Sequence, residues 1–285
     1  MKDPVELFEP PAVSLPVDFF VHVLEVCDIK TLLRCARTCK SLRAAVASEL
    51  RTRRVALFRL FFLDRTRRFN GLLQFYQAIV SGSTALAFFA WPSSWQPGDL
   101  DIYVGDDKYD LFVLDLERQF PVILEFDMPH RPRGLYAGIK GVRRYLTSSG
   151  RRLDVIRSGS PNPASPLLFF WTSLVVNFIT PHGAVCCYPN LTMSEGALVD
   201  NIIPSEKVVS AQAKYESRGF TFTVNGTWRP SPLSLFKGGQ ILVNGDILVV
   251  DFDTIWRSDH RYLPIHRVPT GWVLKAPSLA TPSAF

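Results

Sequence analysis

One short alternating segment constrains the fold of this chain more than any other feature. Residues 99–104 read Asp-Leu-Asp-Ile-Tyr-Val. Polar and apolar residues alternate at its start, as in a strand with one face on a core, so Asp99 and Asp101 should project from the same face. Asp154 stands between two apolar residues, Leu153 and Val155, in a second expected strand. If the two strands are neighbours, three carboxylates converge on one face of a sheet.

Three converging carboxylates predict a site for a hard cation. Mg²⁺ prefers oxygen ligands and takes its remaining ligands from water and phosphate. Gly82 and Ser83 open a short apolar helix expected over residues 84–90. Backbone N–H groups at a helix start can bind a phosphate, and glycine permits its close approach. Because acidic groups held close together repel one another, we expect Mg²⁺ or Mn²⁺ to stabilise the folded protein.

This order of motifs resembles the nucleotidyltransferase superfamily of the polymerase-β type. The residues that carry the resemblance are Val80-Ser81-Gly82-Ser83, Asp99-Leu100-Asp101-Ile102 and Leu153-Asp154-Val155, and it covers about residues 70–180. The resemblance implies that Asp99, Asp101 and Asp154 are metal ligands and catalytic residues, with Asp154 activating the attacking hydroxyl. It further implies that Gly82 and Ser83 hold a nucleoside triphosphate.

One departure from the superfamily pattern is the distance between the two motifs. Ser83 and Asp99 are separated by 15 residues, somewhat more than is usual. The extra length lies in the loop of residues 91–98, which is rich in Pro and Trp. This loop is expected either to reshape the nucleotide pocket or to close it.

Residues 14–68 have a helical pattern. Pro16 lies near a helix start, where its missing N–H is harmless. Phe19, Val23 and Val26 recur at i, i+4 and i+7, as on one face of an amphipathic helix. Asp28 is expected to cap a second helix that runs through residues 42 and 45. The segment is therefore predicted to form a unit of short amphipathic helices.

This N-terminal unit resembles an F-box. The resemblance rests on Leu15-Pro16, on the apolar spacing that follows, on Asp28 and on Cys39-Lys40, whereas Leu42 occupies about the place of the usual Trp after the Lys. It implies docking to a Skp-type adaptor and thereby to a cullin ubiquitin ligase. The residues expected to bind the partner are Leu15, Pro16, Phe19, Phe20, Val23, Leu24, Leu32 and Leu33. The alternative is a helical cap that packs on this protein's own second domain.

The fold class predicted for the whole chain is α+β. It comprises a leader (1–13), an F-box-like helical unit (14–68), a nucleotidyltransferase-like mixed sheet with helices (69–200), a β-rich C-terminal extension packed on that domain (201–275) and a tail (276–285). Within it we expect helices over 72–79 and 108–119 and strands over 122–126, 142–146 and 152–156. For the apolar stretch 167–178, length favours a helix over a strand.

Charge and cysteine content narrow the choice of partners and compartment. The chain has 285 residues and a formal net charge of +6, with arginines clustered over 51–68 and 131–157. Clustered arginines attract phosphates, so nucleic acid is one candidate partner, and a solvated helix face is the alternative interpretation of the first cluster. No membrane segment is expected.

The five cysteines and the absence of a secretory signal predict reduced thiols in the cytoplasm or nucleus, with Cys186 and Cys187 as a buried apolar pair.

Two functions remain open from the sequence. The layout as a whole resembles fungal proteins with an F-box-like N-terminus and a divergent nucleotidyltransferase-fold domain. The leading hypothesis is a ubiquitin-ligase adaptor whose large domain recognises an unknown substrate protein. The rival is an active nucleotidyltransferase that uses Mg²⁺ or Mn²⁺ and a nucleoside triphosphate and modifies an unknown acceptor.

Overall fold

The computed structural model describes residues 17–128, 138–199, 205–225, 236–237, 240–241 and 248–252. Its helices are α1 (Val17–Val26), α2 (Ile29–Cys35), α3 (Lys40–Phe62), α4 (Thr66–Tyr76), α5 (Gly82–Phe89), α6 (Tyr109–Gln119), α7 (Pro189–Thr192) and α8 (Glu206–Glu216), with 3₁₀ turns at η1 (Leu63–Arg65), η2 (Ser165–Phe169) and η3 (Ser173–Val175). None of the helices in these ranges combines the length and the apolar character that a membrane crossing needs.

A mixed eight-stranded sheet forms the centre of the fold, in the order β12-β7-β6-β1-β2-β5-β4-β3. Its strands are β1 (Ile79–Ser81), β2 (Asp99–Val104), β3 (Val122–Met128), β4 (Ile139–Thr147), β5 (Arg152–Ser158), β6 (Asn177–Ile179), β7 (Gly183–Cys186) and β12 (Leu248–Asp251). Within this sheet β2 and β5 run parallel, and the other neighbouring strands run antiparallel. Two small sheets pair β8 (Gly196–Val199) with β9 (Thr221–Val224) and β10 (Phe236–Lys237) with β11 (Gln240–Ile241). The α+β prediction is thus confirmed.

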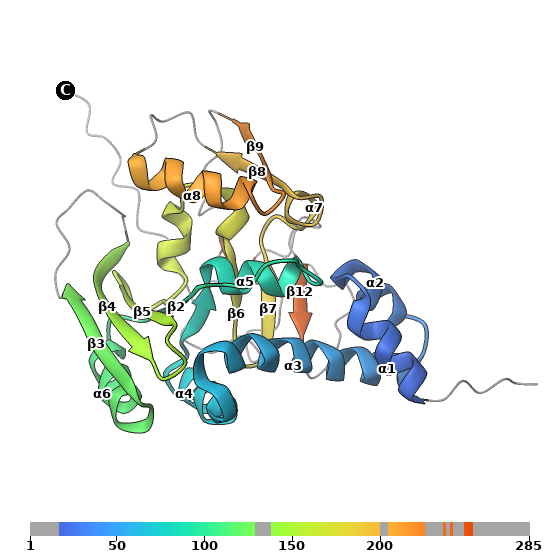
Figure 1. Ribbon diagram of the computed structural model, residues 1–285, viewed down its shortest axis with the longest axis horizontal. Helices are drawn as coiled ribbons and strands as arrows, with labels where there is room; N and C mark the ends of the chain where they lie inside the picture. Colours follow the sequence, from blue (N-terminus) through green and yellow to red (C-terminus); the bar gives the residue numbers. More distant parts are fainter. Residues whose placement is uncertain are drawn as a thin grey trace, which may run out of the picture.

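The N-terminal helices share a core with the sheet. In Figure 1, α1 and α2 lie at one end of the molecule and the long helix α3 runs from them toward α4. Phe58 and Phe61 of α3 are buried in the same apolar cluster as Phe69, Leu100 and Leu153. Helix α3 therefore connects the F-box-like segment to the large domain without a break in the core.

The second helix is shorter than predicted. Asp28 caps it as expected, with its carboxylate accepting from the backbone N–H of Thr31 at 2.7 Å. However, α2 ends at Cys35, and α3 starts afresh at Lys40 with the Cys39 thiol as its cap. Residues 37–40 are all exposed, so burial does not hold one continuous helix there.

The helix predicted over 72–79 ends earlier than predicted. Helix α4 stops at Tyr76, and Gln77 adopts a left-handed conformation with φ of 54°. Ile79 then starts β1, where it pairs with Tyr103 of β2. Short apolar runs fit both helix and strand, and sheet pairing decides between them.

The stretch 167–178 is neither a long helix nor a single strand. It forms η2, η3 and the start of β6, and buried polar groups hold the irregular backbone. Thr172 donates to the carbonyl of Leu198 at 2.9 Å, and Asn177 donates to that of Leu174 at 2.8 Å. The Asn177 bond satisfies a backbone carbonyl within the stretch, and the Thr172 bond attaches the stretch to β8.

The region predicted to be β-rich contains a helix. The four strands β9 to β12 lie in it, but so does α8. Ser205 precedes Glu206 at its start, and Gly219 follows its end with φ of +94°. These are ordinary helix boundary signals. Figure 1 shows α8 beside β8 and β9, on the side of α5 away from α3.

Candidate functional site

The three predicted carboxylates lie on two neighbouring strands. Asp101 of β2 is directly opposite Asp154 of β5, and Asp99 is two residues earlier on the same face of β2. On the other side of β2, Asp101 is opposite Ser81 of β1. The apolar residues between the carboxylates, Leu100 and Leu153, are fully buried. The alternation of the sequence thus produces the expected cluster.

Two of the carboxylates are bound by side chains of the chain itself. Ser83, in the first turn of α5, donates its hydroxyl to Oδ1 of Asp99 at 3.0 Å. Arg144 of β4 donates from Nε and from a terminal nitrogen to the two oxygens of Asp154, each at 2.7 Å. The cluster therefore contains a bidentate arginine–carboxylate pair, the strongest of the ordinary ion-pair geometries.

The third carboxylate lies against the glycine that begins α5. Gly82 has φ of +66°, and a Cβ built on it would lie 2.1 Å from Oδ2 of Asp101. Glycine is required at this position both for the backbone conformation and for the space. Burial, followed by the charges of Asp99 and Asp154, raises the pKa of Asp101 well above its ordinary value, and Lys214 of α8 and Arg144 oppose the rise.

The loop of residues 91–98 connects the large domain to the N-terminal helices. Trp91 donates from its indole to the carbonyl of Glu25 in α1 at 3.0 Å. Trp95 lies under the guanidinium of Arg218, 4.2 Å from its ring centre, and packs edge-on against Phe220. The extra length thus bridges α1 to the segment after α8.

The donor set decides how well a divalent cation fits this cluster. Oxygens of three carboxylates are the right type of ligand for Mg²⁺. Both oxygens of Asp154, however, already accept hydrogen bonds from Arg144. Within the described ranges, no group of three or more His, Cys, Asp or Glu side chains is arranged to hold one metal ion. The three carboxylates do not fit a shared metal site in this arrangement.

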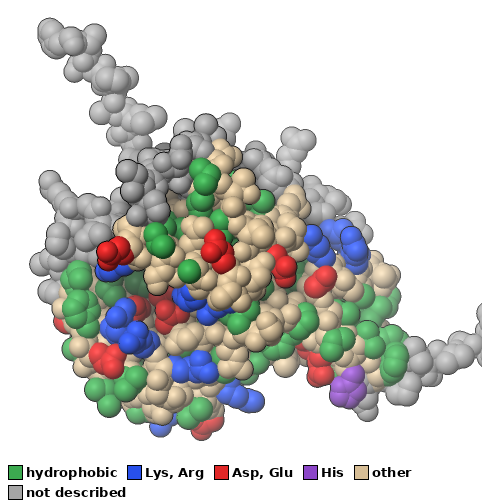
Figure 2. All heavy atoms as spheres, turned by 45° about the horizontal axis from the view of Figure 1, so that its top comes forward, with side chains coloured by type: hydrophobic (Ala, Val, Ile, Leu, Met, Phe, Trp, Pro, Cys, Tyr) green, Lys and Arg blue, Asp and Glu red, His purple; other side chains and the backbone are tan. Residues whose placement is uncertain are grey.

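In the view of Figure 2, acidic and basic side chains lie close together on the surface. Sequence reasoning named the acids but missed both cations, Arg144 and Lys214. The sequence could have predicted the position of Arg144, because the hairpin turn around Gly150 sets a strand register that pairs residue 144 with residue 154. It could not have predicted the position of Lys214, because α8 was not predicted.

The residues predicted to bind a Skp-type partner fall into two groups. Phe19 and Val23 are exposed at 52% and 42%, and Val26 on the same helix stripe at 70%. Leu24 and Leu32 are buried in the core shared with the sheet, and Leu33 packs partly against it. Phe20 is half-buried, and Leu15 and Pro16 lie outside the described residues. Among the described residues of this set, Phe19 and Val23 on the outer stripe of α1 are the most exposed to a partner.

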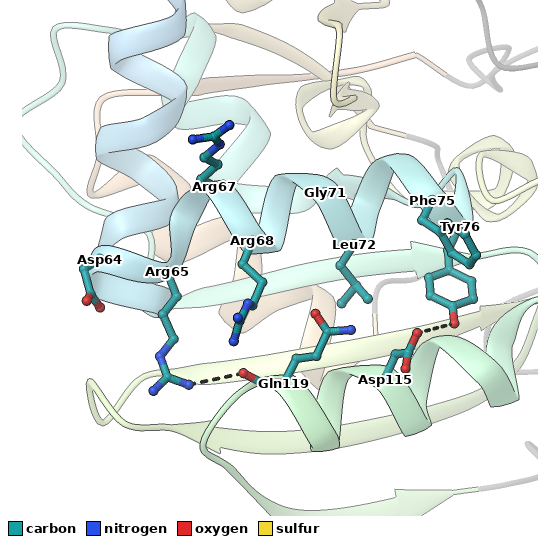
Figure 3. Close-up of a pocket in the computed structure, with 10 residues that line it drawn as sticks. All are labelled: Asp64, Arg65, Arg67, Arg68, Gly71, Leu72, Phe75, Tyr76, Asp115 and Gln119. Atoms are coloured by element: carbon teal, nitrogen blue, oxygen red, sulfur yellow. Dashed lines mark hydrogen bonds between the residues drawn. The ribbon is translucent and has the colours of Figure 1, made fainter.

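The first arginine cluster also divides into two parts. Arg53 is buried and bonds Glu49 and carbonyls at the end of α1, and Arg54 donates to the carbonyl of Pro181. Arg65, Arg67 and Arg68 instead line a surface groove between α4 and α6 (Figure 3). The solvated-face interpretation therefore fails for Arg53 and Arg54.

Comparison with known proteins identifies the N-terminal unit. Residues 12–56 match the family model described as F-box-like. No curated protein is similar to the chain. One similar solved structure is the complex of a CCA-adding enzyme with CTP, with 13% identity and a TM-score of 0.39. The similarity covers 59% of this chain and 42% of the enzyme, so it spans less than half of that protein.

Proposed function

We propose that this chain is an adaptor whose F-box-like helices dock a Skp-type protein while the α+β domain recognises a target. The observation that carries the proposal is the exposed apolar stripe of Phe19, Val23 and Val26 within the F-box-like segment. Large apolar side chains gathered on one helix face are a feature of interaction sites. Through the Skp-type protein the chain would join a cullin ubiquitin ligase in the cytoplasm or nucleus.

The alternative, a helical cap on the chain's own domain, accounts for a different set of residues. Leu24 and Leu32 pack inward, as a cap requires. The outer stripe of α1 faces away from that core, so a capping role does not explain why its side chains are apolar. Both roles are compatible, because they use opposite faces of the same helices.

Binding to a purified Skp-type adaptor tests this proposal. We expect the whole chain to form a complex, and the double variant Phe19→Ala/Val26→Ala to bind roughly 30-fold more weakly or worse, as loss of two interface anchors implies. Leu114→Ala is the matched control, since this side chain is 62% exposed on α6. A wild-type chain that does not bind, or a double variant that binds like the control, would refute the docking role.

The second candidate is a metal-dependent nucleotidyltransferase acting on an unknown acceptor. The convergence of Asp99, Asp101 and Asp154 beside Gly82 and Ser83 favours it. This function requires that Arg144 release Asp154. Incubation with labelled nucleoside triphosphates and Mg²⁺ or Mn²⁺ tests it: a labelled product that disappears in Asp99→Asn/Asp101→Asn would establish the activity.

A further inference from the structure

The pairing of Arg144 with Asp154 follows from their position in the sheet. The two residues are directly opposite each other on the antiparallel strands β4 and β5, and Asp101 continues the same row on β2. The side chain of Asp154 is 15% exposed, and that of Arg144 is 39% exposed. The planar guanidinium therefore lies beside Asp154 on the side away from Asp101 and binds both oxygens of that carboxylate.

The charge state of the cluster depends on the cations beside it. Carboxylates held close together repel one another, and this repulsion is relieved by a nearby cation or by protonation of one carboxyl group, as the raised pKa of Asp101 indicates. The chain supplies positive charge as Arg144, with a second contribution from Lys214. We propose that Arg144 is the resident cation of this cluster, taking the place of a divalent ion and leaving the large domain as a metal-independent binding scaffold.

The neighbouring arginine shows that this placement is specific. Arg143 is one residue earlier on β4, so its side chain points to the opposite face of the sheet. There it pairs with Asp127 at 3.0 Å and lies 3.9 Å from Glu117 of α6. An arginine also suits the role chemically, because it stays charged at every working pH and its fork matches both carboxylate oxygens.

Thermal melting with Mn²⁺ as the probe tests this proposal. The wild-type melting temperature should not respond to millimolar Mn²⁺. Arg144→Gln should melt at a lower temperature without metal, because Asp154 loses its partner, and should gain a Mn²⁺-dependent rise of ~2 °C or more. Three unpaired carboxylates would instead predict that Mn²⁺ raises the melting temperature of the wild type.

Two further variants make the result specific to this pair. Arg143→Gln should gain no Mn²⁺ response, since its side chain lies on the other face. Arg144→Gln/Asp154→Asn should recover stability and lose the response. A wild type stabilised by Mn²⁺ through Asp154, with the rise abolished by Asp154→Asn, would overturn the proposal, as would an Arg144→Gln variant that folds and ignores Mn²⁺. If Arg144→Gln does not fold, the comparison of wild type with Asp154→Asn decides alone.

The adaptor role is tested separately. Strand β4, which carries Arg144, and helix α1 lie at opposite ends of the molecule (Figure 1), so capture of the Skp-type protein should be the same for Arg144→Gln and wild type. A metal-responsive wild type that still binds the Skp-type protein would refute the resident-cation proposal and leave the adaptor proposal intact.

Discussion

The guanidinium of Arg53, in the middle of α3, donates a hydrogen bond to the carbonyl oxygen of Leu24 in α1, 2.8 Å away. A second bond of the same length reaches the carbonyl of Cys27. The buried side chain of Arg53 thus binds carbonyl groups at the C-terminal end of α1. Its Nε donates to the carboxylate of Glu49 at 2.7 Å, which balances its charge. Trp91 donates to Glu25 at the same place, so two side chains from distant segments satisfy the end of one helix.

This relationship predicts a large effect for Arg53→Met. The change removes the donor to the Glu49 carboxylate and to the carbonyl of Cys27, while the carbonyl of Leu24 keeps the backbone N–H of Cys27. Breaking a buried pair by removing one partner costs about 3–5 kcal/mol. The free energy of unfolding, measured by urea denaturation, should fall by that amount. Arg59→Met, at an exposed position on the same helix, should change it by no more than about 0.5 kcal/mol. Equal losses would contradict the capping role.

The cap of α2 can be tested by two substitutions at one residue. Asp28→Ala removes the acceptor for the N–H of Thr31 and should cost about 1 kcal/mol of unfolding free energy. Asp28→Asn keeps an acceptor oxygen and should cost only a few tenths. The backbone hydrogen bond from Thr31 lowers the pKa of Asp28. Its contribution is therefore complete above the unfolded-state pKa and is lost as the pH falls through the folded-state value.

Thiol reactivity should follow the positions of the cysteines. The backbone hydrogen bond from Leu42 lowers the pKa of the exposed Cys39, whereas burial raises the pKa of Cys186 to about 12 and that of Cys187 further. Because the thiolate is the reactive form, Cys39 should be alkylated first at pH 7.5. Cys186 and Cys187 should react only in denaturant. Mass mapping of iodoacetamide adducts against time gives the order, and early labelling of Cys186 or Cys187 would contradict their burial.

How far the sequence predicts this protein differs between its regions. Strand β2 and the shared face of Asp99 and Asp101 follow from alternation over a few residues, a local signal, whereas the pairing of β2 with β5 joins distant segments. The break of α2 at Cys35 and the start of β1 at Ile79 depend on contacts with distant elements, which no local pattern contains. The pairing of Asp154 with Arg144 lies between these two cases, because the hairpin turn around Gly150 sets the strand register but no motif marks the arginine.

The groove of Arg65, Arg67 and Arg68 predicts a salt-dependent affinity for polyanions. Replacing all three by Gln should weaken binding to single-stranded RNA and reduce the slope of log affinity against log salt by roughly 0.7 for each phosphate that the protein no longer neutralises. Arg118→Gln, which removes an exposed arginine of α6 already paired with Asp115, is the control. Fluorescence anisotropy between 50 and 200 mM salt measures the slopes; weak wild-type binding without a slope would leave these arginines as a solvated face.

Replacing glycine by alanine should change the unfolding free energy in opposite directions at positions 71 and 82. Gly71 lies within α4 with no atom near its virtual Cβ, so Gly71→Ala should raise the unfolding free energy by about 0.5–1 kcal/mol through helix propensity alone.

Gly82→Ala meets two obstacles at once. The backbone has φ of +66°, and the new Cβ would collide with the Asp101 carboxylate. The left-handed conformation alone costs ~1–2 kcal/mol, and moving Asp101 disturbs its packing on α5. Urea denaturation of the two variants beside wild type should therefore give shifts of opposite sign. A neutral Gly82→Ala would mean that Asp101 does not pack on the start of α5, and that the space beside Gly82 is open to a ligand.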